Sequence, residues 1–115
     1  MQQTFDYLAH VPCAVRVCDT AGIVLYQNAL AIARDGNVVG QCLYGCHNPQ
    51  SQQKIRDMLS HDTTNTYEVI KGGQRRLVYQ TPWYEQEGGP VAGLVEFAID
   101  LPQDMPVRNR DIPQD

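Results

Sequence analysis

Hydrophobic and polar residues alternate most regularly in the C-terminal half of the chain. Residues 66–71, 74–84 and 91–101 are rich in β-branched and aromatic side chains, and each segment predicts a β-strand. Gly72 and Gly73 separate the first two segments, and a pair of glycines is typical of a tight hairpin turn. A longer acidic segment joins the last two. This half of the chain therefore predicts three consecutive antiparallel strands.

The N-terminal part predicts a hairpin of two shorter strands. Residues 13–18 and 23–26 are apolar and β-branched, and a polar turn at residues 19–22 separates them. Before this hairpin, residues 4–10 predict a short helix, because their apolar side chains share one helical face and Thr4 can cap it.

Helical patterns lie between the two groups of strands. Asn28 has the short polar side chain of a good N-cap and predicts a brief helix over residues 29–33. A longer amphipathic helix follows, which Asn48 or Ser51 can cap. Its apolar positions recur at helical spacing: Ile55, Met58 and Leu59. This order of elements predicts an α+β fold, in which helices cover one face of a five-stranded antiparallel sheet.

Composition and charge limit the classes of partner. The 115 residues carry nine Lys and Arg against thirteen Asp and Glu, for a formal net charge of -4. Basic residues cluster only at Lys71, Arg75 and Arg76, whereas nucleic-acid binding needs a dense basic face. No apolar run has the length of a membrane span, and the first residues lack the pattern of a signal peptide. We therefore expect a cytoplasmic domain that contacts neither nucleic acid nor membrane.

Several short features occur at fixed places in this order of elements. Pro12 precedes the first strand, a turn rich in small polar residues follows it, and Asn28 comes after the second strand. The last strand closes on Ile99-Asp100-Leu101. Together they resemble the PAS domain, the sensory-box module of bacterial signalling proteins, which often ends in Asp-Ile-Thr before an effector. The resemblance covers about residues 3–101.

A second motif narrows the resemblance to one subgroup of PAS-like domains. The run Cys46-His47-Asn48-Pro49-Gln50-Ser51 is similar to the Cys-His-x-Pro-x-Ser of a subgroup of PAS-like domains. A Leu-Glu-Val recurs in the last strand of that subgroup, and Leu94-Val95-Glu96-Phe97 approximates it here. The segment between Asn28 and Gly40 is shorter than in most PAS domains. A shorter helical wall beside the pocket argues against a large cofactor.

The resemblance implies a sensor of two parts. Residues 1–101 would form the PAS-like domain with its short N-terminal helix, and residues 102–115 a Pro-rich linker to an effector in the same polypeptide. PAS domains of this kind commonly precede a diguanylate cyclase (GGDEF) domain or a histidine kinase. A small ligand or a partner would act on the domain, and Asp100 and Leu101 would carry the output. The resemblance also implies a homodimer.

The resemblance places a ligand pocket between the sheet and the helices. Its candidate lining residues are Cys42, Tyr44, Cys46, His47, Met58, Glu96 and Ala98. Because side chains alternate along a strand, Glu96 and Ala98 share one face, which the PAS register turns towards the helices. A carboxylate there needs a partner, and we expect His47 or Arg76. Alternatively, the register turns Glu96 to solvent, or Glu96 pairs with an arginine of a neighbouring strand.

Cys42, Cys46 and His47 could also hold a cofactor. His47 is a candidate axial ligand for non-covalent haem, whereas zinc would need a fourth ligand, His61 or Cys18. The spacing Cys-x-x-x-Cys-His is one residue too long for covalent haem attachment. The simplest interpretation makes both cysteines buried thiols and His47 a hydrogen-bonded side chain. The cofactor is thus unknown, and we expect none in the isolated domain.

Two other functional classes remain open from the sequence. One is a haem-, metal- or redox-responsive domain that uses the cysteines and His47, and the other is a dimerisation module without a ligand. An enzyme is not expected, because the chain has no nucleophile elbow, no phosphate-binding loop and no paired-carboxylate motif.

Overall fold

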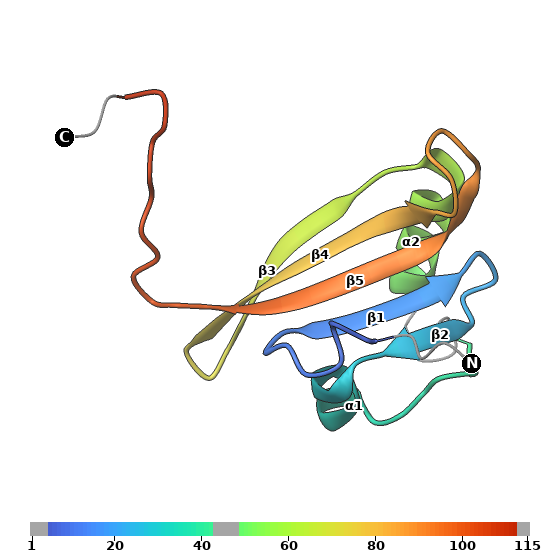
Figure 1. The fold of residues 1–115 in the computed structure, drawn as a ribbon, viewed down its shortest axis with the longest axis horizontal. Helices are drawn as coiled ribbons and strands as arrows, with labels where there is room; N and C mark the ends of the chain where they lie inside the picture. Colours follow the sequence, from blue (N-terminus) through green and yellow to red (C-terminus); the bar gives the residue numbers. More distant parts are fainter. Residues whose placement is uncertain (1–4, 43–48, 113–115) are drawn as a thin grey trace.

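The computed structural model of the protein describes residues 5–42 and 49–112. Its sheet has five antiparallel strands in the order β2-β1-β5-β4-β3 (Figure 1). The elements in chain order are β1 (Ala14–Asp19), β2 (Val24–Gln27), α1 (Ala29–Asp35), α2 (Pro49–His61), β3 (Asn65–Lys71), β4 (Gln74–Tyr84) and β5 (Val91–Leu101). The first hairpin and the last three strands meet where β1 pairs with β5. The predicted α+β fold is confirmed.

Most predicted bounds differ from the observed ones by one residue or not at all. Strands β4 and β5 have the predicted bounds, β3 starts one residue earlier, and β1 and β2 are each displaced by one residue. Gly72 and Gly73 have φ angles of 59° and 81°, which fits the predicted tight turn between β3 and β4. Helix α1 runs two residues further than expected, to Asp35, and Gly36 caps it with a φ of 78°.

The predicted N-terminal helix was wrong for the residues that the structure describes. Residues 7–10 form a turn instead. So short a segment gains too few internal hydrogen bonds to offset helix nucleation, and its carbonyls bond elsewhere. The Ala29 amide donates to the Ala9 carbonyl at 2.9 Å, and the Asn28 side chain donates to the Leu8 carbonyl at 3.0 Å.

Asn28 joins three segments with its side-chain amide. Its Oδ1 caps α1 by accepting from the Ala31 amide at 3.1 Å, as the sequence predicted, and it also accepts from the Val15 amide at 3.0 Å. Its Nδ2 donates to Leu8 and to the Cys13 carbonyl, the latter at 2.8 Å. Because Asn28 is only 2% exposed, these bonds leave no part of its amide unsatisfied.

Helix α2 begins at Pro49, a position where proline is common because its nitrogen needs no acceptor. Ser51 lies inside the helix and so is not its N-cap, and Asn48 lies outside the described residues. The helix packs on the sheet through Ile55 and Met58. The core cluster that they join is Cys18, Val24, Ile55, Met58 and Leu94.

The register of the strands gives the sheet two distinct faces. The inner face, which the helices cover, carries Cys18, Leu94, Glu96 and Ala98, whose neighbours on β4 include Val78 and Gln80. The open face carries Leu77, Tyr79, Val95, Phe97 and Ile99. Tyr79 and Ile99 are exposed on it. Tyr79 and Phe97 lie directly opposite each other on this face.

Gly93 lies where three strands come close together. Trp83 reaches from β4 across Gly93 to β1, and its indole Nε1 donates to the Cys18 carbonyl at 2.9 Å. A Cβ at Gly93 would lie 2.6 Å from that nitrogen and would overlap the Cys18 carbonyl. This position requires glycine because any side chain would separate the strands.

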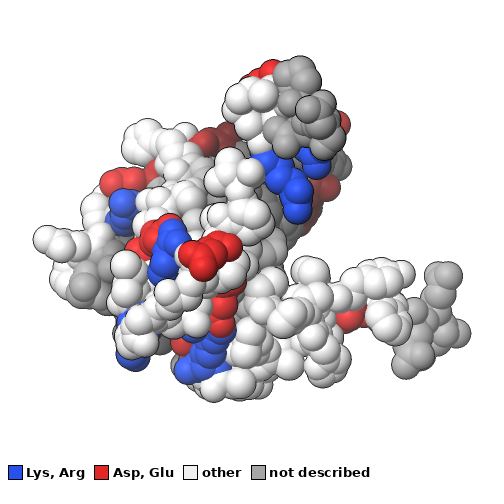
Figure 2. Space-filling model, turned by 90° about the vertical axis from the view of Figure 1, so that its left-hand side faces the viewer, with Lys and Arg blue, Asp and Glu red and all other residues white. Residues whose placement is uncertain are grey.

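Two surface features complete the fold. Residues 102–112 form neither helix nor strand and run away from the end of β5 (Figure 1). On the side shown in Figure 2, Lys and Arg side chains lie beside Asp and Glu side chains.

Candidate functional site

A cavity of 150 Å³ lies between α1 and the inner face of the sheet. Its charged lining residues are Arg16, Arg34, Asp35, Arg76 and Glu96. Its uncharged lining residues are Ala14, Ala31, Val69, Val78 and Ala98. Small side chains on α1, β1 and β5 leave this space open, and the charged side chains surround it.

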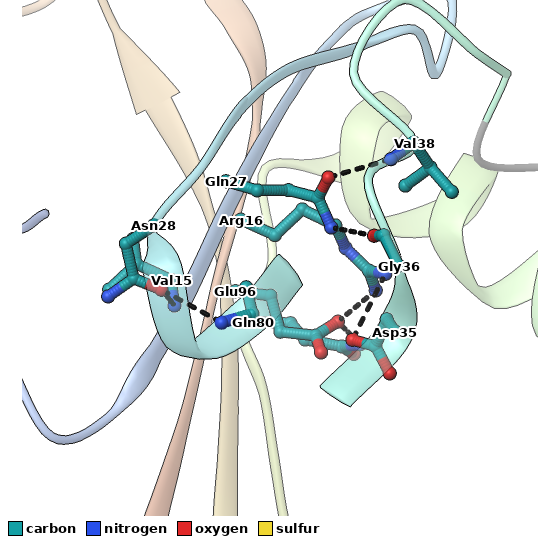
Figure 3. A network of polar contacts seen from close by, with 10 residues as sticks. Val15, Arg16, Gln27, Asn28, Asp35, Gly36, Val38, Gln80 and Glu96 are labelled. Atoms are coloured by element: carbon teal, nitrogen blue, oxygen red, sulfur yellow. Dashed lines mark hydrogen bonds and ion pairs between the residues drawn. The ribbon is translucent and has the colours of Figure 1, made fainter. Parts of the chain in front are cut away.

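Glu96 is the centre of a polar network on the inner face (Figure 3). Its Oε2 accepts from Arg16 Nη2 at 3.1 Å and from Gln80 Nε2 at 2.9 Å. The two partners lie directly opposite Glu96 on β1 and β4. Arg16 also approaches Asp35 of α1, with 4.0 Å between Nη1 and Oδ2. The network thus links the sheet to the last turn of α1.

Glu96 faces the helices, in agreement with the register that the PAS resemblance implied. The expectation that Arg76 is its partner was wrong, because Arg76 donates to Asp100 instead. The alternative, an arginine of a neighbouring strand, is the one observed, since Arg16 of β1 donates to Glu96. The antiparallel register explains the difference. Arg16 and Gln80 are the direct cross-strand neighbours of Glu96, whereas Arg76 lies opposite Asp100. His47, the other expected partner, lies outside the described residues.

Gln27 fixes the segment that follows α1. Its Nε2 donates to the Gly36 carbonyl at 3.1 Å, and its Oε1 accepts from the Val38 amide at 2.8 Å (Figure 3). Gln27 is 7% exposed, so both halves of its buried amide are satisfied. This contact holds the C-terminal end of α1, and with it Arg34 and Asp35, against the sheet.

Asp100 connects α1, β4 and the end of β5. Arg76 Nε donates to its Oδ1 at 2.8 Å, and Arg34 Nη2 donates to its Oδ2 at 3.0 Å. The hydrogen bond from Arg76 and the charge of Arg34 hold the pKa of Asp100 below its ordinary value. The Arg34 Nη1 atom is buried and has no hydrogen-bond partner within the described part of the chain. One nitrogen of the Arg34 guanidinium group is therefore unsatisfied and closed to solvent.

Other predicted site residues have different environments. Ala98 lines the cavity, as Glu96 does. Met58 is 3% exposed and belongs to the core under α2, where it also lines a more open groove of 580 Å³ with polar residues of α2 and β3. Leu101, with Asp100 an expected output residue, is half-buried at the end of β5. Its carbonyl accepts from Gln74 Nε2 at 3.2 Å.

The cysteine and histidine predictions have mixed outcomes. Cys42 is exposed, so the interpretation of Cys42 as a buried thiol was wrong. The segment before it runs along the outside of β2, where the Val24 amide donates to the Gln41 carbonyl at 2.9 Å. Cys18 is buried, and burial raises the pKa of its thiol. Tyr44, Cys46 and His47 lie outside the described residues, and so does any haem or zinc site that they would form. Over residues 5–42 and 49–112, no three His, Cys, Asp or Glu residues gather as metal ligands.

Sequence reasoning missed Arg16, Arg34, Asp35 and Gln80. Arg16 and Gln80 become neighbours of Glu96 only because β1 and β4 both pair with β5. A sequence pattern predicts strands but gives no order of strands in a sheet. Arg34 and Asp35 fall where a shorter helix was expected to have ended already, so they were not considered as pocket residues.

Comparisons with known proteins support the fold at low sequence identity. The PAS domain of the histidine kinase ThkA superposes with a TM-score of 0.62 at 16% identity, covering 76% of this chain and 98% of that one. A sensory box sensor histidine kinase from Vibrio cholerae has a TM-score of 0.62 at 12% identity, covering 80% and 84%. VqmA bound to DPO has a TM-score of 0.63 at 18% identity, covering 81% of this chain and 54% of that one.

No family model and no curated protein matches the sequence. The likeness to solved structures therefore shows a PAS-like fold. Among the described residues, no helix combines the length and the apolar character needed to cross a membrane.

Proposed function

We propose that this chain is a cytoplasmic sensory domain of PAS type that binds a small ligand between α1 and the inner face of the sheet. The observation that carries this proposal is the 150 Å³ cavity. It is surrounded by charged side chains that also contact the last residues of β5. Sensing needs a ligand site and a path from it to the output, and the cavity and the contacts of Asp100 lie close enough together to serve as both. The domain would act without a catalytic site of its own.

The output would leave through Asp100 and Leu101. Asp100 is bound by arginines of α1 and β4, so a change at the cavity alters the contacts that hold the end of β5. Residues 1–101 would be the sensor, and residues 102–115 the linker to an effector. Two of the compared structures are PAS or sensory-box parts of histidine kinases, which supports a histidine kinase as that effector. A diguanylate cyclase is the alternative that the PAS resemblance implies.

The open face would form a homodimer. Tyr79 and Ile99 are exposed beside the half-buried Leu77 and Phe97, so this side of the sheet presents an apolar surface. One of the compared structures is described as a dimer of VqmA from Vibrio cholerae, with 18% identity and a TM-score of 0.64. The run from Cys46 to Ser51 supports placing the domain in the subgroup with the Cys-His-x-Pro-x-Ser motif.

The test of ligand binding is a nuclear magnetic resonance screen of the ¹⁵N-labelled protein with a library of small polar metabolites. A ligand of the cavity should shift the amide signals of Ala31 and Ala98 and, through Asp100, that of Leu101. Ala98→Leu should abolish the shifts because the larger side chain occupies the cavity. Val95→Leu, on the open face of the same strand, is the matched control. The proposal fails if no library member produces a saturable shift that Ala98→Leu removes.

A further inference from the structure

We propose that the C-terminal segment, residues 102–112, adds as a further strand to the outer edge of β3 in a second copy of this chain. The inference rests on the proposed homodimer and adds a second contact to it. Three observations carry it: the unprotected edge of β3, the exposed side chains of the C-terminal segment, and the match between the two sequences when they run antiparallel.

The sheet has two edge strands, β2 and β3, and β2 is the protected one. Strand β2 has only four residues, and the chain after α1 covers its outer side. The Val24 amide donates to the Gln41 carbonyl at 2.9 Å, and the Gly40 amide donates to the Val24 carbonyl at 2.8 Å. A register shift also interrupts the pairing of β2 with β1. Short edge strands, irregular pairing and a covering loop are means by which proteins keep an edge from pairing with another chain.

Strand β3 differs from β2 in each of these respects. Within residues 5–42 and 49–112 it pairs with β4 alone, over seven residues and without a register shift. All its residues after Asn65 are exposed, and Ile70 is 70% exposed. The strand contains no proline and is rich in β-branched side chains. A regular, exposed edge of this kind is a template for an added strand.

The C-terminal segment has exposed apolar side chains and runs away from its own domain (Figure 1). Val107 is 89% exposed and Ile112 is 57% exposed. The segment leaves the domain at the β3–β4 turn, where Gln103 Nε2 donates to the Gly73 carbonyl at 3.3 Å. Burial of these apolar side chains would be favourable. Because the segment points away from its own sheet, a second copy is the partner that it can reach.

One antiparallel register matches the side chains of the two strands. With Val107 opposite Val69, two apolar side chains meet on the inner side of the extended sheet, since directly opposite residues share a face. The next pair then places Arg108 opposite Glu68 on the open face, because side chains alternate along both strands. Apolar pairs and pairs of opposite charge both stabilise neighbouring strands.

The same register accommodates the proline of the segment. Pro106 lies opposite Ile70, whose side chain is largely exposed in the single chain. A proline is tolerated in an edge strand, where its missing N–H can face solvent. A shift of two residues would bring Arg110 opposite Glu68 but would lose the apolar match at Val69. The register with Arg108 opposite Glu68 is therefore the one that matches both faces.

The added strand would extend the proposed dimer surface. Glu68 and Ile70 lie on the open face, opposite Leu77 and Arg75 of β4, so the edge of β3 borders the apolar surface. In a symmetric dimer each copy would donate one segment and accept one. Because the segment continues β5, each copy would connect its own output strand to the sheet of the other.

The experiment exchanges charges between two copies. Arg108→Glu and Glu68→Arg should each weaken the dimer about tenfold or more, because like charges then face each other at both contacts. A mixture of the two single variants should regain an affinity within about threefold of wild type, since both contacts of the heterodimer again pair opposite charges. Sedimentation velocity over a range of concentrations measures the dissociation constants. Structural damage in either variant would not be repaired by mixing, so absence of recovery would overturn the proposal.

Arg110→Glu is the matched control for the register. It makes the same charge change in the same segment, but Arg110 would lie opposite Thr66 rather than Glu68. It should weaken the dimer much less than Arg108→Glu, and mixing it with Glu68→Arg should not restore the wild-type affinity. Recovery with Arg110→Glu in place of Arg108→Glu would overturn this pairing.

A mixture of ¹³C-labelled and unlabelled wild-type chains distinguishes exchange between copies from docking within one chain. Isotope-filtered nuclear Overhauser spectra should show contacts between the Val107 methyl groups of one copy and the Val69 methyl groups of the other. Docking of the segment on β3 of its own chain would remove these contacts, and the mixed variants would not recover. Either result would overturn exchange between copies.

The same assays distinguish failure of the strand exchange from failure of the proposed function. A dimer that Tyr79→Glu weakens but that changes at Arg108 and Glu68 do not affect would overturn the exchange and leave the open-face dimer intact. A wild type that stays monomeric would overturn both contacts of the dimer, but not ligand binding in the cavity beside α1.

Discussion

Two neighbouring arginines of β4 show how differently the two faces of the sheet use the same side chain. Arg75, on the open face, donates to Glu68 on β3 through Nε at 3.2 Å and through Nη2 at 2.6 Å. Arg76, on the inner face, shares Asp100 with Arg34 of α1. The Arg75 pair is closed and joins two adjacent strands. The group of Arg76, Asp100 and Arg34 joins three elements beside the cavity.

The comparison of the two arginines distinguishes the face of the sheet that would bind a ligand from the face that would form a dimer. Inner-face charges lie between a helix and the sheet, so their contacts change when anything enters that space. Open-face charges are solvated and paired within the sheet, and their neighbours are exposed apolar side chains. We therefore expect the inner face to determine stability and ligand binding, and the open face to determine assembly.

The largest expected contrast is in stability. Leu94→Ala should lower the free energy of unfolding by about 3 kcal/mol, because Leu94 is 2% exposed and packs in the core cluster. Ile99→Ala, on the open face of the same strand, should cost less than about 1 kcal/mol, since Ile99 is 37% exposed. Urea unfolding followed by circular dichroism measures both values. Equal costs would remove the distinction between the faces.

The second contrast concerns buried and solvated carboxylates. Glu96→Gln should lower the free energy of unfolding by about 1–2 kcal/mol, because Arg16 loses its close partner in a half-buried position. Glu68→Gln removes the partner of Arg75 on the open face and should cost much less, because solvent screens an exposed ion pair. The same unfolding assay applies. A neutral Glu96→Gln would show that the network in Figure 3 adds little.

The third contrast concerns assembly. Tyr79→Glu should weaken the proposed homodimer about tenfold, since it places a charge in the apolar open face. Lys71→Gln at the β3–β4 turn, away from that apolar surface, lowers the net charge by the same one unit and should leave the dimer intact. Sedimentation velocity over a range of concentrations gives the dissociation constants. A monomeric wild type, or an equal loss in both variants, would contradict assembly through the open face.

The smallest expected effect is on the pH dependence of stability in the acid range. Asp100 has a lowered pKa in the folded state because Arg76 donates to it and Arg34 adds a positive charge. Its stabilising contribution is present above the ordinary value of 3.8 and is lost as the pH falls through the lowered folded value. Asp100→Asn should therefore reduce the loss of stability between neutral pH and acid. Urea midpoints at several pH values below 5 test it, and an unchanged slope would contradict the assignment.

The sequence predicted the sheet well because its information is local. The alternation in β4 and β5, the two glycines between β3 and β4, and the cap at Asn28 each act over a few residues. Residues 7–10 failed as a helix because distant groups on Asn28 and Ala29 compete for their carbonyls. Local pattern cannot report such a competition.

The candidate site was only partly predictable for the same reason. Alternation placed Glu96 and Ala98 on the helix side, and their position is confirmed by the cavity lining. The partners of Glu96 depend on which strands lie beside β5, and Arg34 depends on where α1 ends. The role of Cys42 was misjudged because an apolar sequence context does not show that a segment runs along the outside of β2.

Because the Trp83 indole donates to the Cys18 carbonyl, the intrinsic fluorescence of Trp83 reports on the contact between β4 and β1. Trp83 is the chain's one tryptophan, and it pairs with Gly93 at the opposite end of β5 from Asp100. About seven residues of extended strand, roughly 23 Å, separate the two points. Intrinsic fluorescence that stays constant while a ligand changes the contacts of Asp100 would mean that only the end of β5 responds. A changed emission would mean that the signal moves the whole strand.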